Sequence, residues 1–436
     1  MNAVKVGLLG LGTVGGGAAT VLIRNAEEIL ARLGRGIDIS HVAGLDIKSQ
    51  TIVNPASTKL TEDAFEVVND PEVEIVVELI GGYTLAKDLV LKAIENGKHV
   101  VTANKALIAT HGPEIMKAAA EQGVSVSYEA AVAGGIPIIK AMREGLAGNK
   151  IQWIAGIING TGNFILSEMR DKGRDFSDVL KEAQELGYAE ADPTFDVEGI
   201  DAAHKLTILA SLAFGVALQF DKTYTEGISK ITTEDMSYAE ELGYRIKHLG
   251  ITRKTSKGIE LRVHPTLIPE KRLIANVDGV MNAVLVYGDA VGPTLYYGAG
   301  AGAEPTASAV VADIIDTVRT IDAPLHHKVP LLGFQNDAMR DTAILPIEDV
   351  ETAYYLRMEA EDKPGVLAEV SDTFAKNSIS IEAVLQKEPV SGENSVHLIM
   401  LTQKCVESNV NKAIAAVEQL VSVQGDVVRI RMEHLD

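Results

Sequence analysis

The chain opens with a buried strand that runs directly into a glycine-rich turn. Residues 4–9 are apolar but for one lysine, the turn reads Gly10-Leu11-Gly12-Thr13-Val14-Gly15, and a helical pattern follows from Ala18 to Leu33. This order is the dinucleotide-binding fingerprint, because glycines let the backbone approach a pyrophosphate and the helix N-terminus offers unpaired N–H groups. The alternative is a turn that only packs a βαβ unit closely. We expect an NAD or NADP cofactor here, contacted by Gly10, Gly12, Thr13, Val14 and Gly15.

The choice between the two cofactors depends on the end of the second expected strand, residues 41–45. Asp46 follows this strand directly, and Lys48 comes two residues later. A carboxylate there would bind a free ribose 2′-hydroxyl, whereas a lysine would pair with a 2′-phosphate. Because both are present, the pattern leaves NAD and NADP open, with Asp46 and Lys48 as the residues that decide.

Strands and helices go on alternating after the fingerprint. Strands are expected at 74–79, 99–102 and 124–128, and helices at 85–96 and 113–122. This alternation predicts an α/β fold with a parallel, doubly wound sheet that binds ligands at the carboxyl ends of its strands. Two such ends carry Gly81 and the run Thr102-Ala103-Asn104-Lys105, so we expect Gly81, Thr102 and Lys105 to contact the cofactor, with Lys105 beside its nicotinamide half. The alternative for Lys105 is an ordinary surface lysine that follows a strand.

A carboxylate cluster precedes a strongly apolar helix between residues 186 and 205. The segment reads LGYAEADPTFDVEGIDAAHK, and it places Glu190, Asp196 and Asp201 ahead of Lys205. Carboxylates near a core need a positive partner, and a substrate ammonium or a lysine would supply it. The alternative is a routine ion pair between Asp201 and Lys205 at i, i+4. Both residues share a helix face with Ile208 and Leu212, which favours a site for a small amino-bearing molecule.

The segment from Tyr128 to Pro137 surrounds a single carboxylate, Glu129, with glycine and alanine. Small residues expose backbone carbonyls, and a carboxylate among carbonyls is suited to a hard monovalent cation. A tight structural crossover would read the same way, so both interpretations stay open.

Composition limits the classes of function that this chain can have. The 436 residues carry a net charge of −20, which argues against nucleic acid or an anionic membrane surface as partner. No apolar stretch is long enough to span a bilayer, and no secretion signal opens the chain. The single cysteine, Cys405, fits a reducing cytoplasm and lies in the C-terminal part, so a thioester route to aldehyde oxidation is disfavoured. Direct hydride transfer at a carbon bearing oxygen remains.

Taken together, the motifs resemble those of homoserine dehydrogenases from about residue 3 to about residue 320. They are GLGTVG, TANK, YEAAVAGGIP, NGTGNFIL and the acidic segment before Lys205. The resemblance implies NAD(P)-linked interconversion of L-homoserine and L-aspartate 4-semialdehyde, on the route to threonine, methionine and isoleucine. It also implies a Rossmann domain over 1–135, to which 300–322 returns, and a substrate-binding and dimerisation domain with an open mixed sheet over 136–320.

The same resemblance assigns roles to single residues. Lys205 would be the general acid/base and Lys105 would lie near the same oxygen. Glu190 and Asp201 would bind the substrate ammonium, with Asp196 orienting the lysines or the substrate. A Na⁺ ion would be held by Glu129 and by the carbonyls of Val132, Gly134 and Ile136, and Gly302 would lie close to the cofactor. One departure bears on the cofactor: Leu45 stands before Asp46 where many relatives carry an arginine.

The last part of the chain reads as a separate module. Residues 321–350 contain three prolines and little periodicity, as in a linker, and 351–436 follow a βαββαβ order. This order resembles an ACT domain, and an unrelated ferredoxin-like dimerisation domain is the alternative. We expect a threonine effector, a homodimer or homotetramer, and a module that folds separately, so that truncation near Pro346 would spare catalysis. Two competing functions are another amino-acid-pathway dehydrogenase on this scaffold and a non-catalytic, nucleotide-sensing ACT regulator.

Overall fold

The computed structural model describes residues 2–45, 47–324, 327–387 and 395–436, without the side chains of Lys48 and Asn336. It divides into two compact units. Unit 1 comprises residues 1–160, 201–223 and 280–342, and unit 2 comprises residues 161–200, 224–279 and 343–436. Within the described ranges, no helix is long and apolar enough to cross a membrane.

The first sheet of unit 1 is entirely parallel, with the strand order β3-β2-β1-β4-β5-β6. This order is that of a doubly wound Rossmann sheet, which confirms the predicted fold class. The chain reverses direction across the sheet between β1 and β4, and dinucleotides bind at such a switch point. The strands are β1 (Val4–Leu9), β2 (Ile37–Ala43), β3 (Lys59–Thr61), β4 (Ile75–Glu78), β5 (His99–Thr102) and β6 (Val126–Ser127).

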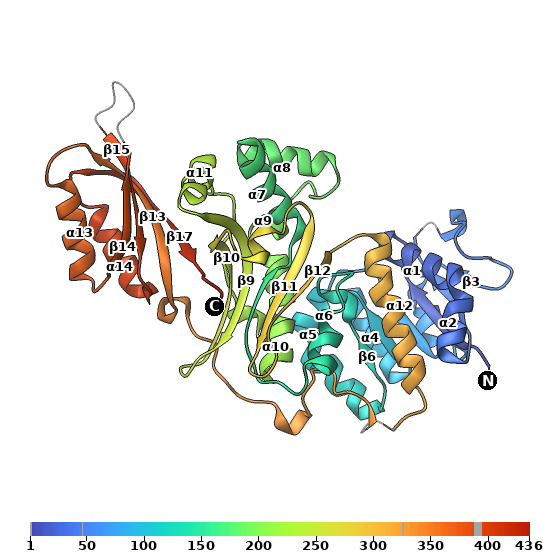
Figure 1. Ribbon diagram of the computed structural model, residues 1–436. Coiled ribbons are helices and arrows are strands. Elements are labelled where there is room, and N and C mark those ends of the chain that lie inside the picture. Colours follow the sequence, from blue (N-terminus) through green and yellow to red (C-terminus); the bar gives the residue numbers. More distant parts are fainter. Residues whose placement is uncertain (1, 46, 325–326, 388–394) are drawn as a thin grey trace. The chain divides into compact units, whose positions relative to one another are not determined.

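Helices cover this sheet, and α12 lies alongside α1 (Figure 1). The two helices approach closely, because a Cβ atom at Gly17 would lie 2.5 Å from the Ala303 carbonyl oxygen. Segment 303–320 therefore packs against the helix that follows the glycine turn. The helices are α1 (Thr13–Arg24), α2 (Ala26–Leu33), α3 (Ala64–Asn69), α4 (Thr84–Glu95), α5 (Lys105–Gln122) and α12 (Ala303–Thr320).

Two helix boundaries differ from the sequence expectation. The helix expected over 18–33 begins at Thr13 and is interrupted at Asn25, which starts α2. The helix expected over 113–122 begins at Lys105 and contains Pro113 within it. At the second boundary the side chain of Asn104 caps the helix, whereas Asn25 forms no side-chain cap.

The rest of unit 1 contains three antiparallel strands and helical segments. Strands β7 (Ile151–Ile157), β11 (Met281–Gly288) and β12 (Gly292–Ala299) pair in the order β12-β11-β7. The short α6 (Ile138–Lys140) leads into a π-helical turn, Ala141–Gly145. Helix α10 (Ile200–Phe214) is buried from Asp201 to Phe214. A helix apolar on all sides belongs in a core, and α10 holds its two charged residues there.

Unit 2 is built on a mixed sheet in the order β9-β10-β17-β13-β15-β14. Its strands are β8 (Tyr224–Thr225), β9 (Tyr244–Lys254), β10 (Ile259–Pro269), β13 (Glu351–Glu361), β14 (Ile381–Gln386), β15 (Ser395–Thr402), β16 (Cys405–Val406) and β17 (Val423–Met432). Its helices are α7 (Gly160–Lys172), α8 (Phe176–Glu185), α9 (Thr194–Val197), α11 (Thr233–Glu241), α13 (Val366–Lys376) and α14 (Glu407–Val417). From β13 to β17 the order is βαββαβ, as predicted, with α13 and α14 packed on one face (Figure 1).

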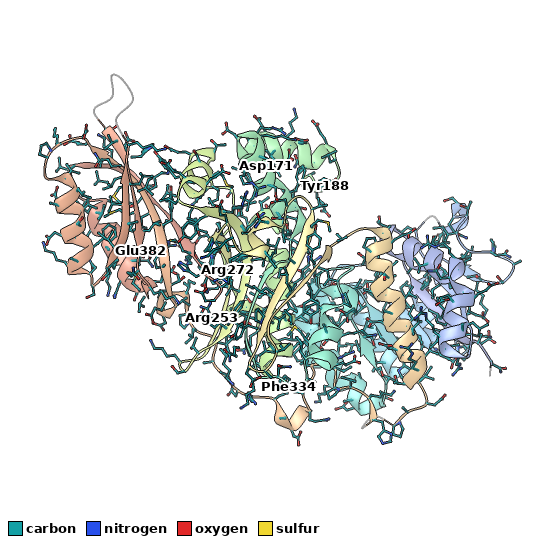
Figure 2. All side chains as sticks on the ribbon, viewed as in Figure 1. Asp171, Tyr188, Arg253, Arg272, Phe334 and Glu382 are labelled. Carbon is teal, nitrogen blue, oxygen red and sulfur yellow. The ribbon has the colours of Figure 1, made fainter. Side chains whose placement is uncertain are left out.

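The C-terminal module is not structurally separate from the rest of unit 2. Its last strand, β17, pairs in parallel with β10, so that Thr266 faces Arg431 and Leu267 faces Met432. A buried ion network crosses this seam, in which Arg262 pairs with Glu433 and with Glu260. Arg253, labelled in Figure 2, also lies 3.0 Å from Glu433. The module and strands β9 and β10 therefore form one continuous sheet.

Candidate active site

The glycine turn has a backbone that only glycine can adopt at two of its positions. Gly10 has a φ of +96°, and a Cβ atom at Gly15 would lie 2.1 Å from the Gly10 carbonyl oxygen. Gly12 is the N-cap of α1, and its lack of a side chain leaves the first N–H groups of the helix open. With Thr13 and Val14 in the first helical turn, the predicted residues leave open a helix N-terminus, the kind of backbone to which phosphate groups bind.

A buried glutamate shapes the loop at the carboxyl end of β4. Glu78 is fully buried and accepts hydrogen bonds from the hydroxyl of Thr102 at 2.6 Å and from the N–H groups of Ile80 at 3.0 Å and Gly81 at 3.1 Å. Burial raises the pKa of the Glu78 carboxyl, against the effect of these donors. The Thr102 side chain thus holds the loop that presents Gly81. Any contact of Thr102 with a cofactor would come from its backbone.

Two lysines converge on one carboxylate inside unit 1. Lys105, the first residue of α5, has its Nζ 3.1 Å from Asp201 Oδ1. One turn along α10, Lys205 has its Nζ 2.7 Å from Asp201 Oδ2 and donates to the Ile158 carbonyl at 2.7 Å. The amide of Asn159 also donates to Asp201 Oδ2, at 2.8 Å. The cluster therefore carries a net charge of +1 at the end of α5 that borders the cofactor-binding edge.

Asp201 stays ionised in this setting. Burial alone would raise its pKa, but Lys205 and Lys105 lower the pKa of this carboxyl well below its usual range. Lys205 is only 11% exposed, whereas Lys105 is 34% exposed. A buried lysine held by a carboxylate and a carbonyl can donate a proton in one fixed direction.

The other carboxylates predicted for this site belong to unit 2. Glu190 follows α8 and is exposed, and its carbonyl accepts from the amide of Gln184 at 3.1 Å. Asp196 lies in α9 and is half-buried. Their roles toward a substrate ammonium remain predictions.

The predicted cation segment is organised by its carboxylate. Glu129 is buried and accepts from the N–H groups of Ile139 and Lys140, both at 2.8 Å. Its own N–H donates to Asp313 at 2.7 Å. Burial, followed by the charge of Asp313, raises the pKa of Glu129 to about 7, and burial raises that of Asp313 to about 6. Two neighbouring buried carboxyl groups fit a bound cation electrostatically.

Each oxygen of the Glu129 carboxylate already accepts one N–H group at the start of α6, and its role as a cation ligand stays a prediction. Ala133 and Gly134 have φ angles of +54° and +41°, which turns the chain sharply, and the Ile136 carbonyl accepts from Ile138 N–H at 2.8 Å. In the described ranges, three or more His, Cys, Asp or Glu side chains nowhere gather into a metal-binding group. The carbonyls of Val132, Gly134 and Ile136 would have to supply most of the ligands.

Gly302 is the N-cap of α12, with a φ of +125°. Since α12 packs against α1, this turn lies in the same unit as the glycine-rich turn. Asp46 falls outside the described residues and the Lys48 side chain is not described. The cofactor preference that these two residues decide is therefore untested.

Comparisons with known proteins identify the same family along the whole chain. The family models "Homoserine dehydrogenase, NAD binding domain", "Homoserine dehydrogenase" and "ACT domain" match residues 10–129, 137–315 and 354–421. The homoserine dehydrogenase of Pseudomonas aeruginosa is 64% identical over 436 residues, which is 100% of each chain. That of Neisseria gonorrhoeae is 59% identical over 435 residues, again 100% of each. The chain belongs to the homoserine dehydrogenase family.

Solved homoserine dehydrogenases share the fold. The crystal structure from Thiobacillus denitrificans is 64% identical, has a TM-score of 0.94 and covers 100% of this chain and 99% of that one. A hyperthermophilic archaeal homoserine dehydrogenase in complex with NADPH is 26% identical, with a TM-score of 0.61, and covers 74% of this chain and 99% of that one. The predicted homoserine dehydrogenase fold with an ACT domain is confirmed.

Two side chains that organise the homoserine dehydrogenase site were not singled out from the sequence. Asn159, inside the NGTGNFIL motif, holds Asp201, and Glu78 builds the loop that carries Gly81. Glu78 is the last residue of β4, at the carboxyl end where ligands bind in parallel sheets, and Asn159 is the second residue after β7. This position relative to the strands was the sequence signal that could have indicated both residues.

Proposed function

We propose that this chain interconverts L-homoserine and L-aspartate 4-semialdehyde with a nicotinamide cofactor. The observation that carries the proposal is the pair of lysines on Asp201, with distances of 3.1 Å and 2.7 Å. A carbonyl oxygen that becomes an alkoxide needs positive charge and a proton, and this pair supplies both. Spectrophotometric assay with homoserine and either NAD⁺ or NADP⁺ tests the proposal. Absence of turnover with both would favour a nucleotide-sensing regulator.

The residues of the chain would divide the work as follows. When bound, the cofactor supplies or accepts the hydride. In the direction of reduction, Lys205 donates its Nζ proton to the oxygen of the semialdehyde, and Lys105 stabilises the charge on that oxygen. In the reverse direction, Lys205 takes the proton from the homoserine hydroxyl. Asp201 keeps both ammonium groups in place, with Asn159 fixing its second oxygen.

This arrangement alters the role that we propose for Asp201. Its Oδ1 faces Lys105 and its Oδ2 receives Lys205 and Asn159, so a substrate ammonium would have to displace one of them. We therefore propose Asp201 as a positioning residue for the lysines. Glu190 remains the proposed ligand for the substrate ammonium.

Substitution of Glu190 and of Asp201 should change different kinetic constants. Glu190→Gln should raise the homoserine KM by at least about tenfold, because a hydrogen bond to a charged group is worth about 1.5–3 kcal/mol. Asp201→Asn should instead lower kcat, because it loosens both lysines. Glu185→Gln, at the exposed end of α8, is the matched control and should change neither constant. An unchanged KM for Glu190→Gln would move the ammonium site elsewhere.

Cofactor choice stays open between NAD and NADP. The archaeal relative was solved with NADPH, and Lys48 would pair with its 2′-phosphate, whereas Asp46 would favour a free hydroxyl. The ratio of kcat/KM for the two cofactors in the wild type and in Lys48→Ala decides the question. The proposal also includes a monovalent cation, bound by the carbonyls of Val132, Gly134 and Ile136. It further includes a homodimeric or homotetrameric assembly and a location in the cytoplasm.

We further propose L-threonine as an effector of the ACT domain, since this amino-acid-sensing fold is attached to an enzyme of the threonine route. Titration of the full-length oligomer with threonine, methionine and isoleucine tests this, and effector coupling is typically about 1–3 kcal/mol, or several-fold in affinity. No heat and no inhibition from any of the three would leave the domain an assembly role.

Deletion of residues 346–436 should abolish soluble, active protein rather than spare catalysis. The deletion removes β17, which leaves the β10 edge unpaired, and it removes Glu433, which leaves Arg262 buried without this partner. Solubility and activity of the deletion variant are the measurements. A soluble variant with wild-type turnover would contradict the continuity of the sheet as a requirement for folding.

A further inference from the structure

Unit 1 contains a large cavity that the proposed reaction does not use. Its volume is about 710 Å³, within the range of about 300–1,000 Å³ that is typical of small-molecule sites. The walls come from the C-terminal half of α5, the residues before β6, the end of α12 and the segment 328–339. The apolar part of the lining includes Met116, Leu218, Val329, Leu331 and Met339.

The cavity is separate from the lysine cluster. Lys105 is the first residue of α5, whereas Pro113 is the first residue of that helix to line the cavity, and the rise over these eight positions is about 12 Å. Val124 and Ser125 also line it, and they precede β6. The cavity thus lies toward the amino ends of the parallel strands, opposite the edge with Gly10 and Gly81.

The wall formed by segment 328–339 is held in place by contacts within unit 1. The Tyr128 hydroxyl donates to the Leu331 carbonyl, and Arg340 N–H donates to the Gly215 carbonyl at 2.6 Å. The ring of Phe334, labelled in Figure 2, comes within 2.9 Å of the place that a Cβ atom of Gly215 would take. This segment therefore closes the cavity as a packed wall.

One side chain in the lining lacks the partners that its burial calls for. Arg143 is only 10% exposed, and its nearest ion-pair contact is Glu144 at 3.5 Å. It donates no hydrogen bond to any part of the chain that the structure describes, and its Nε is a buried, unpaired atom. Glu129 and Asp313 offset its charge through space. Buried guanidinium groups normally donate several hydrogen bonds. Arg143 lines the cavity and its Nε is enclosed by protein, so an anion in the cavity would accept from the terminal nitrogens of the guanidinium.

The remaining charges of the lining favour an anion. Glu121 lies 3.9 Å from Lys117, and Asp316 lies 2.9 Å from Arg319. Lys328 adds a further positive charge and, across the described ranges, forms no ion pair. The third acid of the lining, Glu144, is exposed and lies 3.5 Å from Arg143. The described lining thus has three acids against four cations, and the excess is positive.

We propose that this cavity binds a small organic carboxylate with an apolar body. The carboxylate pairs with the guanidinium of Arg143, whose planar fork matches that group, and the apolar body fills the space between Met116, Leu218 and Leu331. The site is distinct from the proposed substrate, cofactor and effector sites.

Calorimetric titration of the full-length protein with three probes of equal shape tests the proposal. 4-Phenylbutyrate should bind at least tenfold more tightly than 4-phenylbutanol and 4-phenylbutylamine. NADP⁺ and homoserine at saturation should leave this binding unchanged. Equal binding of the three probes, no binding of 4-phenylbutyrate at millimolar concentration, or its displacement by NADP⁺ or homoserine would overturn the proposal.

Variants locate the binding. Arg143→Met should weaken 4-phenylbutyrate at least tenfold, and Ala120→Trp, which fills the cavity from α5, should abolish its binding while circular dichroism stays native. Arg24→Met, at an exposed position outside the lining, is the matched control and should change the affinity less than threefold. Undiminished binding in Ala120→Trp overturns the proposal. The proposal is also overturned if the wild type binds no probe and Ala120→Trp converts an oligomer to a monomer. The cavity would then be an interface between copies of the chain.

Discussion

Replacing Lys205 by alanine should lower kcat by about 100-fold or more, the range expected for a lost general acid/base. The ammonium of Lys205 is buried and directed by Asp201 and by the Ile158 carbonyl, both at 2.7 Å. A water molecule admitted in its place would be a far weaker acid at neutral pH. Because the glycine turn is untouched, the Kd of the cofactor should stay unchanged. Stopped-flow measurement of hydride transfer and fluorescence titration of NADPH separate the two effects.

Three further variants serve as comparisons for Lys205→Ala. Lys105→Ala should lower kcat by a similar factor, although its loss also changes the surroundings of the cofactor. Lys205→Arg keeps the charge but holds its proton too tightly, so it should restore substrate binding without restoring turnover. Lys222→Ala removes an exposed lysine of the same unit and should behave as the wild type. Near wild-type turnover in Lys205→Ala would refute the assigned role.

The parts of the fold that follow from local patterns could be predicted from the sequence. The first strand and the fifth, residues 4–9 and 99–102, have the expected bounds, and the βαββαβ order of the last module is correct. These elements combine short apolar runs with clear glycine or polar ends, so that neighbours in sequence determine them.

The errors arose where polar residues or distant pairings decide the structure. Asn104 caps α5 by accepting from Leu107 N–H, so the helix begins eight residues before Pro113. This start places Lys105 at the positive end of a helix, which disfavours a cation unless Asp201 compensates it. Apolar periodicity contains no information about such a compensation.

The active site could be predicted only in part for the same reason. The i, i+4 spacing places Asp201 beside Lys205, whereas Lys105 and Asn159 reach Asp201 from separate segments of the chain. The pairing of β17 with β10 also joins segments more than 150 residues apart. Local patterns cannot reveal contacts of this kind, so the continuity of the last module with β10 could not be predicted from them.

Replacing Arg431 by methionine should destabilise unit 2 by about 3–5 kcal/mol, the usual cost of breaking a buried ion pair from one side. Arg431 is fully buried on β17, and its guanidinium donates to Glu407 and to Glu226, both at 2.8 Å. Methionine leaves these carboxylates with Arg429, at 3.3 Å and 3.5 Å, as their remaining cation. The midpoint of the urea transition, followed by circular dichroism and by the fluorescence of the tyrosines, measures the loss. Arg24→Met breaks an exposed pair with Glu304 and should hardly move the midpoint.

The pH dependence of this loss of stability distinguishes two causes, which are carboxylates left buried without their cation and the loss of side-chain packing. In the wild type, burial would raise the pKa of Glu226, but Arg431 lowers it below its usual range, so the pair contributes stability above the unfolded pKa of about 4.3 and loses it in acid. In Arg431→Met the sign reverses, because a buried carboxylate with less compensation has a raised pKa and is relieved by protonation. The deficit relative to the wild type should therefore shrink between pH 7.5 and pH 5. Adding Glu407→Gln should recover part of the loss at pH 7.5. A deficit that is constant with pH and unaffected by Glu407→Gln would show that Arg431 stabilises the seam through packing alone.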